Sequence, residues 1–187
     1  MKRNHLILNL CLVMLLAGFV SCDKDSEPSA YEKGNLIGHY VGNCTVTMGS
    51  KHDVISGFPV EFRQNDTQSL SLNIGDEASY RSIGIFTVKK ASGFKDYGSY
   101  ARFNLENINV DFSAEHIPDF INNNIQLSWD IKSVLLKLYI DSQNPPKYTI
   151  ASKELSFTYT GTIEITGKNT GEKHSSPIKY TFNLNRK

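Results

Sequence analysis

The sequence predicts an all-β protein, an antiparallel meander that closes into a single β-barrel, with a β-sandwich as the alternative. Apolar and polar residues alternate with a period of two from Leu36 to the end of the chain, and turn residues interrupt the alternation at short intervals. No stretch supports a helix longer than one or two turns. The 187 residues are 40% hydrophobic and 21% charged, with a formal net charge of +1. This balance indicates one folded domain and argues against a disordered chain or an electrostatic nucleic-acid binder.

The first half of the chain predicts four strands separated by polar or glycine-containing turns. In the first strand, Tyr40, Cys44 and Val46 share one face of the alternation. Pro59 in the second suggests a sheet edge or a strand start, because proline lacks a backbone N–H. The predicted strands are residues 40–48, 58–62, 70–74 and 83–88, and the polar segment 89–99 is a predicted exposed loop.

The segment 101–112 changes the phase of its alternation. Phe103 and Leu105 share one parity, whereas Ile108 and Phe112 share the other. Because a one-residue slip sends side chains to the opposite face of a sheet, a bulge or bend near residues 106–107 is needed to keep both sets inward. Such a break is typical of a barrel corner and favours the barrel over the sandwich.

The second half of the chain predicts one helical turn at residues 115–123 and four further strands. The sequence Asn144-Pro145-Pro146 interrupts the pattern between the second and third of these strands. About nine or ten strands are therefore expected in total, and short connections between them favour antiparallel pairing. The predicted strands are residues 125–131, 134–140, 155–165 and 178–184.

Residues 1–21 have the pattern of a secretory signal peptide. Lys2 and Arg3 form a positive start, and residues 6–20 are apolar except for Asn9. A retained membrane span would need more length, and a core helix would show a polar face. We therefore expect this segment to direct export.

The end of this segment resembles the lipobox of bacterial lipoproteins, in which a small residue precedes an invariant cysteine. Ser21 and Cys22 match that pattern. The resemblance implies that Cys22 is lipidated and anchors the protein in the outer membrane, where two or more acyl chains bind stably. Residues 22–34 would then carry the lipid and form a polar tether, and residues 35–187 would form the barrel domain. The acidic residues 23–27 resemble signals for surface display, which favours the cell surface over the periplasmic face.

Two alternatives remain open for Cys22: lipidation, or a disulfide bond with Cys44. Cys11 leaves with the signal, so a lipidated Cys22 leaves Cys44 alone and the domain without a disulfide. Ordinary cleavage would instead permit a Cys22–Cys44 bridge; lipidation is favoured, because a cysteine at this junction would otherwise be coincidental. Removal of Lys2 and Arg3 with residues 1–21 changes the net charge from +1 to −1.

Further residues extend the resemblance to the calycin-like β-barrel lipoproteins and related families of unknown function in gut Bacteroidota. They are Cys22 with its acidic tether, the opening strand at residues 36–42 and the last strand at residues 180–184. Gly38-x-Tyr40 is similar to the glycine-x-tryptophan start of lipocalins, and Arg186 matches the arginine that caps that tryptophan. The resemblance implies a lipocalin-like barrel with a carrier or binding role and no enzymatic activity.

The residues themselves supply no catalytic or metal-binding constellation. The mature chain would keep four histidines, none at metal-ligand spacing, and one cysteine cannot build a structural zinc site. Ser50, His52 and Asp53 lie in one polar stretch, which favours a solvated turn over a triad. Cys44 lies among apolar neighbours, which favours a buried thiol. No cofactor, metal or nucleic acid is expected. The four histidines are His39, His52, His116 and His174.

Two carboxylates keep a low-weight glycan-hydrolase hypothesis open. Asp130, beside Trp129, and Glu164 both lie on predicted strands, opposite the main apolar set. Glycoside hydrolysis needs two carboxyl groups about 5 to 9 Å apart in a cleft. Solvent-facing charges are the simpler interpretation.

Aromatic residues of inward parity are the candidate ligand-lining set: Tyr40, Trp129, Tyr159 and Tyr180. Packing in the core is the alternative role for the same residues. Large inward phenylalanines favour a filled interior over an open one. These phenylalanines are Phe58, Phe62, Phe157 and Phe182.

The sequence therefore predicts a non-enzymatic cell-envelope lipoprotein that binds a small apolar ligand or a glycan. The alternative is a protein-interaction module of an envelope complex, with residues 89–99 as its best candidate surface. An apolar cavity of at least roughly 300 Å³ would favour the carrier, and a filled interior would favour the module.

Overall fold

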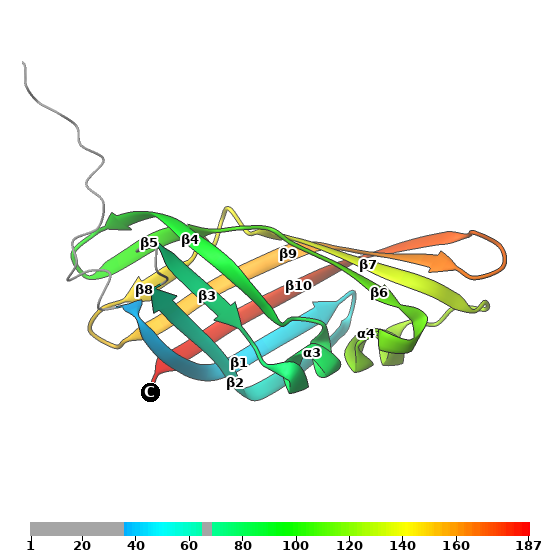
Figure 1. The fold of residues 1–187 in the computed structure, drawn as a ribbon, viewed down its shortest axis with the longest axis horizontal. Coiled ribbons are helices and arrows are strands. Elements are labelled where there is room, and N and C mark those ends of the chain that lie inside the picture. Colours follow the sequence, from blue (N-terminus) through cyan, green and yellow to red (C-terminus); the bar gives the residue numbers. More distant parts are fainter. Residues whose placement is uncertain (1–35, 65–68) are drawn as a thin grey trace, which may run out of the picture.

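The computed structural model describes residues 36–64 and 69–187 (Figure 1). The predicted signal peptide at residues 1–21, the tether at residues 22–34 and the lipidation site Cys22 lie outside the described residues. Within the described part of the chain, no helix has the length and apolar character needed to cross a membrane.

The described residues form ten β-strands, two short α-helices and one 3-10 helix. The first half contains β1 (Gly38–Met48), β2 (Lys51–Gln64), β3 (Leu70–Ile74), α3 (Glu77–Ile83), β4 (Thr87–Asp96) and β5 (Tyr100–Leu105). The second half contains β6 (Ile108–Ser113), η1 (Ala114–His116), α4 (Asp119–Asn124), β7 (Ile131–Ile140), β8 (Lys147–Thr149), β9 (Glu154–Gly167) and β10 (Lys173–Arg186).

All ten strands belong to one antiparallel sheet, in the order β10-β1-β2-β3-β4-β5-β8-β9-β7-β6. β10 also pairs with β9 along its length, from Lys173 opposite Thr166 to Asn185 opposite Glu154. The sheet therefore returns on itself in part and has a ring-like closure (Figure 1). The predicted all-β class and the antiparallel pairing are confirmed.

The predicted break near residues 106–107 is confirmed as the gap between β5 and β6. The two strands pair with different partners, since Ala101 lies opposite Tyr148 of β8 and Ile108 lies opposite Leu138 of β7. β8 and β7 in turn both pair with β9. The break allows Leu105 and Ile108 both to be buried, and it leaves β6 as the last strand of the sheet.

The inward faces of the strands form one apolar core. In β1 the expected parity is confirmed, since Tyr40, Cys44 and Val46 are fully buried. Gly42, on the same face, lies so close to β10 that an added Cβ would be 2.2 Å from the Asn183 carbonyl oxygen. The core holds eight fully buried aromatic side chains among its largest members: Tyr40, Tyr159, Tyr180, Phe58, Phe62, Phe103, Phe112 and Phe182.

The strand predicted at residues 83–88 and the loop predicted at residues 89–99 are both wrong. Ile83 ends α3, and β4 covers most of the predicted loop. Asp76 caps the helix by accepting from the Ser79 backbone N–H at 2.8 Å, and Gly84 ends it in the left-handed region at φ 81°. Ile83 belongs to the end of a helix, and β4 shows no clear alternation because its exposed Val88 is apolar and Lys89, on the parity of buried Ala91, is charged.

The predictions for residues 125–131 and for Pro59 have different outcomes, and the first is wrong in its start. Residues 125–130 are irregular, because Trp129 and its apolar neighbours pack against the core without strand pairing, and the strand begins at Ile131. Pro59 lies inside β2, at the point where pairing with β3 ends: pairing with β1 runs from residue 51 to residue 62, whereas pairing with β3 covers residues 60–64. The expected edge position therefore holds on the β3 side of the strand. The carbonyl of Pro59 accepts from the Gly75 N–H at 2.8 Å on that side, where the missing proline N–H interrupts no pairing of the described strands. The predicted helical turn is confirmed by η1 and α4.

Candidate functional site

The interior of the sheet is filled by aromatic rings in contact with one another. Phe157 stacks on Phe182 with ring centroids 4.3 Å apart. Tyr40 contacts Phe62 and Tyr148 edge-on, with centroids 6.0 and 6.1 Å away. Offset and edge-on contacts are the favourable geometries for aromatic pairs. Phe62, Phe157 and Phe182, which the sequence places inward, are therefore packed against other rings.

Three of the four predicted ligand-lining residues are fully buried in this core. The hydroxyl of Tyr40 donates to the Leu36 carbonyl at 2.8 Å, and that of Tyr159 donates to the Glu106 carbonyl at 2.8 Å. The hydroxyl of Tyr180 donates to the carbonyl of Ile83 at 2.7 Å. The buried phenols therefore satisfy backbone carbonyls outside the strands: before β1, between β5 and β6, and at the end of α3.

Burial raises the pKa of each of these three tyrosines above the usual range, so their hydroxyls stay protonated and donate. The fourth predicted residue, Trp129, lies elsewhere. It is half-buried in the irregular segment before β7, against Gly167 of β9. The structure does not bring Trp129 together with the three tyrosines.

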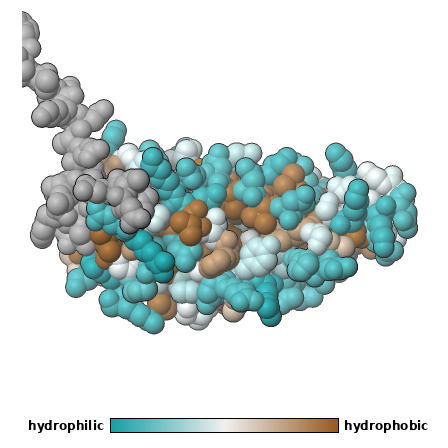
Figure 2. Space-filling model, in the orientation of Figure 1, coloured by the Kyte–Doolittle hydropathy of each residue, from teal (hydrophilic) through white to brown (hydrophobic). Residues whose placement is uncertain are grey.

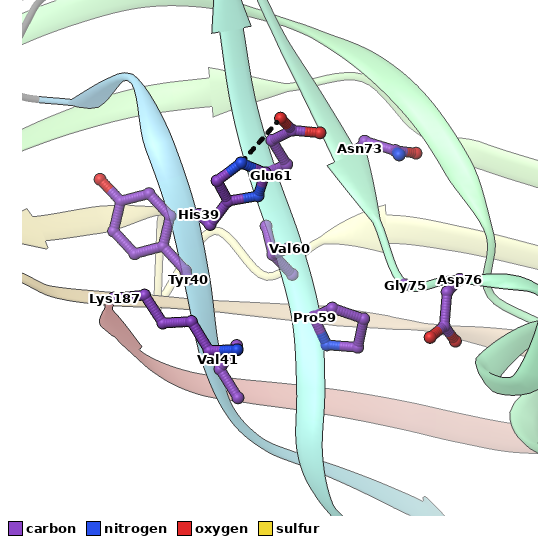
Figure 3. Close-up of a pocket in the computed structure, with 10 residues that line it drawn as sticks. All are labelled: His39, Tyr40, Val41, Pro59, Val60, Glu61, Asn73, Gly75, Asp76 and Lys187. Carbon is purple, nitrogen blue, oxygen red and sulfur yellow. Dashed lines mark ion pairs between the residues drawn. The ribbon is translucent and has the colours of Figure 1, made fainter.

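A groove of about 390 Å³ lies on the outer face of β1, β2 and β3 (Figure 3). Its volume is within the range of small-molecule sites. The residues around it carry an imidazole, two carboxylates, an amide and an ammonium group, together with apolar surface. The groove is lined by His39, Tyr40, Val41, Pro59, Val60, Glu61, Asn73, Gly75, Asp76 and Lys187.

Strand register assembles the polar wall of this groove. His39 lies directly opposite Glu61, and Glu61 lies directly opposite Asn73, so the three form one row across β1, β2 and β3. Each is flanked in its own strand by a buried residue, so the outward parity places all three on the same face. Lys187 joins the row because its backbone N–H donates to the His39 carbonyl at 2.9 Å.

The Glu61 carboxylate is held in its ionised form. The hydrogen bond from Arg63 lowers the pKa of this carboxyl, and the charges of Arg63 and His39 act in the same direction. Nε2 of His39 lies 3.3 Å from Oε1 of Glu61, and this contact is the dashed line in Figure 3. Glu61 is therefore a hydrogen-bond acceptor in the groove at neutral pH.

The carboxylate of Asp76 and the amide of Asn73 lie at the other side of the groove (Figure 3). Asp76 accepts from the backbone N–H and the hydroxyl of Ser79, at 2.8 and 2.7 Å, and these bonds lower the pKa of its carboxyl. Oδ1 of Asn73 is buried and has no hydrogen-bond partner. A buried acceptor without a partner costs about 1–3 kcal/mol, so this amide needs an explanation.

The other residues considered from the sequence lie outside this groove. Glu164 accepts from Nζ of Lys137 at 2.7 Å, and Asp130 is exposed before β7. His116 and His174 are hydrogen-bonded to nearby serine hydroxyls. Burial raises the pKa of the Cys44 thiol, which is a free cysteine in the core. Among residues 36–64 and 69–187, no group of three or more His, Cys, Asp or Glu residues could hold a metal ion.

Sequence reasoning did not identify the groove. Of the four residues predicted to line a ligand site, Tyr40 is among those that line the groove. His39 was considered only as one of four histidines, and Glu61, Asn73 and Asp76 were not singled out. Their outward parity between buried neighbours was a signal in the sequence. The pairing of three strands is what brings them together, and that follows from register rather than from any local motif.

The predicted interaction surface at residues 89–99 is ordered as β4 and its hairpin to β5. Tyr97 is 51% exposed. Its ring stacks on that of Tyr100, with centroids 4.9 Å apart and planes 12° apart. A stacked pair of one exposed and one half-buried tyrosine therefore marks the tip of this hairpin.

Comparison of the chain with protein-family models, with curated proteins and with solved structures finds no match in any of the three.

Proposed function

We propose that this protein is a non-enzymatic cell-envelope lipoprotein that binds a sugar unit of a glycan in the groove on β1, β2 and β3. In this proposal Cys22 carries the lipid and holds the protein at the outer membrane, on the cell surface. The ring-like sheet is a lipocalin-like barrel whose interior serves stability, and ligand binding takes place on its outside.

The observation that carries the proposal is the contrast between the two faces of β1, β2 and β3. Their inward face is packed with buried aromatic and aliphatic side chains, which favours outer binding over an internal apolar ligand. Their outward face places His39, Glu61 and Asn73 in one row beside a groove of about 390 Å³. Such a groove with few convergent polar groups is typical of small-ligand sites.

The chemistry of the row suits a polyhydroxylated ligand. The ionised carboxylate of Glu61 accepts hydrogen bonds from hydroxyl groups, and Lys187 donates to ring and hydroxyl oxygens. Pro59 and Val41 offer apolar surface to the C–H face of a sugar ring. A turn of the Asn73 amide about its broad terminal torsion would bring its unpartnered oxygen to a ligand hydroxyl.

The groove carboxylates support binding rather than hydrolysis. A glycosidase needs one carboxylic acid whose raised pKa keeps it protonated as the general acid. The pKa of Glu61 and that of Asp76 are both lowered, by Arg63 and by Ser79 respectively. Neither carboxyl group is therefore a proton donor at neutral pH.

The binding claim is tested by NMR titration of residues 23–187, which contain every described strand and helix. The probes are glucose, galactose, mannose and N-acetylglucosamine, each as monosaccharide and as β-linked trisaccharide. Shifts at His39, Glu61 and Asn73 are expected with at least one probe, and Asn73→Leu and Glu61→Gln should remove them. Ser71→Ala, on the same face of β3, is the matched control. Shifts confined to the hairpin at Tyr97, or none with any probe, would contradict the groove assignment.

The anchoring claim is tested separately in membrane fractions of cells that express the full chain. Cys22→Ala is expected to release the protein into the soluble fraction after a high-salt wash, and Ser26→Ala is the control that leaves the lipobox intact. Persistent membrane association of the Cys22 variant after a high-salt wash would contradict the lipid anchor.

A protein-interaction module is the second candidate, and the free edge of β6 favours it. Among the residues that the structure describes, β6 pairs only with β7, and residues 87–90 of β4 pair only with β3. Phe86 and Val88, just before and in β4, are 48% and 63% exposed. Figure 2 shows hydrophobic residues along the middle of the side of the molecule that it presents. An unpaired edge beside apolar side chains can add a strand from a partner. Crosslinking from a photoreactive group at position 88 in intact cells would trap such a partner; an uncrosslinked chain would count against this candidate.

A further inference from the structure

Three cations form a row across neighbouring strands at the end of the sheet where β1 begins. Lys95 of β4 lies directly opposite Arg102 of β5, and Arg102 lies directly opposite Lys147 of β8. Like charges placed directly opposite each other destabilise a sheet. No carboxylate within salt-bridge distance of these three cations is found in the described residues.

The two hairpin tyrosines lie beside this row. The guanidinium of Arg102 is 5.9 Å from the ring centre of Tyr97 and 5.6 Å from that of Tyr100. Nζ of Lys147 is 4.9 Å from the ring centre of Tyr100. The one acidic side chain in this hairpin, Asp96, accepts from the Gly98 N–H at 2.7 Å and closes the turn. We call Lys95, Tyr97, Tyr100, Arg102 and Lys147 the cationic tyrosine face.

The described chain enters the fold at the same end of the molecule. Gly38 starts β1 there, and the ring of Tyr40 in β1 contacts the ring of Tyr148, the neighbour of Lys147. Figure 1 shows the β4–β5 hairpin, the start of β1 and the C-terminus at one end of the sheet. Cys22 precedes Leu36 by 14 positions, which span at most about 50 Å when fully extended.

From this placement we infer that the cationic tyrosine face contacts the anionic headgroups of the membrane in which the protein is anchored. Tyrosine rings are favoured at the level of lipid headgroups, and lysine and arginine are attracted to anionic lipid. In this contact, anionic headgroups would neutralise the like charges of Lys95, Arg102 and Lys147. The contact would also orient the groove of β1, β2 and β3 relative to the membrane. The inference rests on the proposed envelope location, but it needs neither the lipid on Cys22 nor a ligand in the groove.

The test uses residues 23–187 without lipid, so that only the protein surface binds. Flotation with vesicles of phosphatidylcholine and with vesicles containing 30% phosphatidylglycerol separates charge-dependent from general binding. The protein is expected to float with the anionic vesicles at low salt and to dissociate at 0.5 M salt, because screening weakens exposed charges. Each cation removed should weaken partitioning about fivefold, so Lys95→Gln, Arg102→Gln and Lys147→Gln together should weaken it on the order of a hundredfold.

A matched triple variant separates this face from net charge. Lys51, Lys168 and Lys173 are exposed on the hairpins at the opposite end of the sheet. Changing these three to Gln alters the net charge equally and should leave vesicle binding unchanged. Circular dichroism establishes that both triple variants are folded. Equal loss in the two triple variants, equal binding to both vesicle types, or binding to dextran sulfate without vesicle binding would each overturn the inference. Membrane association of the Cys22→Ala protein that persists after a high-salt wash would overturn the lipid anchor alone and would leave this inference standing.

Discussion

Tyr40 of β1 and Arg186 of β10 lie directly opposite each other and together hold the two residues that precede β1. The Tyr40 hydroxyl donates to the Leu36 carbonyl at 2.8 Å, and a guanidinium nitrogen of Arg186 donates to the Ile37 carbonyl at 2.7 Å. The charge of Arg186 also offsets part of the rise in the pKa of Tyr40 that burial causes. β1 and β10 are therefore joined by backbone pairing and by two side chains that bind neighbouring carbonyls, those of Leu36 and Ile37.

Removing either side chain should loosen this closure. Tyr40→Phe leaves the carbonyl of buried Leu36 without its donor and is expected to lower the free energy of unfolding by about 1–2 kcal/mol. Arg186→Met removes a charged donor and should cost about 1.5–3 kcal/mol. Because both side chains hold the same turn, the double variant should lose less than the sum of the two. Urea unfolding with an unchanged m value measures all three; strict additivity would show that the two contacts act independently.

A second prediction concerns the close approach of β7 to β9 at Gly161. A Cβ at this position would lie 1.8 Å from the Lys137 carbonyl oxygen, and that backbone cannot move without breaking the pairing of the two strands. Gly161→Ala is expected to cost about 3 kcal/mol or more, or to prevent folding. Gly49→Ala is the matched control, because nothing lies within 4 Å of its Cβ and its φ of 59° costs only about 1 kcal/mol. Thermal unfolding of the two variants measures the difference, and a similar loss in both would refute the steric argument.

A third prediction concerns the break between β5 and β6. The Tyr159 hydroxyl donates to the Glu106 carbonyl at 2.8 Å and holds the chain where the alternation changes phase. Tyr159→Phe should cost about 1–2 kcal/mol and speed amide exchange at Asn107 and Ile108, with little change in β10. Tyr139→Phe, at a tyrosine that is 49% exposed, should have no such effect. Exchange that rises evenly over all strands would mean that the bond stabilises the whole fold rather than this break.

Local pattern predicted much of this fold, because each long strand has one buried and one exposed face. It also predicted the phase break, since Leu105 and Ile108 can both be buried only if the chain shifts between them. It failed at residues 83–99, where Ile83 belongs to a helix end and polarity in β4 does not follow the period of two: Val88 is exposed, and Lys89 shares the parity of buried Ala91. The signals for that helix, Asp76 as N-cap and Gly84 as C-cap, were present in the sequence.

The candidate site was less accessible to sequence reasoning than the fold. Tyr40, Tyr159 and Tyr180 were correctly expected to point inward, but burial parity alone does not separate a ligand wall from a packed core. The groove depends on His39 lying opposite Glu61 and Glu61 opposite Asn73. These pairs come from register between separate strands, which no local spacing encodes.

The buried thiol and phenol groups of the core predict that the folded protein loses stability at alkaline pH. Burial raises the pKa of the Cys44 thiol and of the Tyr40, Tyr159 and Tyr180 hydroxyls, so the folded chain keeps protons that the unfolded chain releases. Their stabilisation is complete below the unfolded pKa values, about 8.5 for cysteine and about 10 for tyrosine, and is lost as pH rises above them. Each group contributes a slope of at most about 1.4 kcal/mol per pH unit.

Urea unfolding from pH 8 to 11 should show this decline in the free energy of unfolding, and absorbance at 295 nm should show a late step of tyrosine ionisation that coincides with unfolding. Cys44→Val should flatten the part of the curve between about pH 8.5 and 10. Complete ionisation of all nine tyrosines near pH 10 in a protein that stays folded would contradict the buried positions of these three hydroxyls.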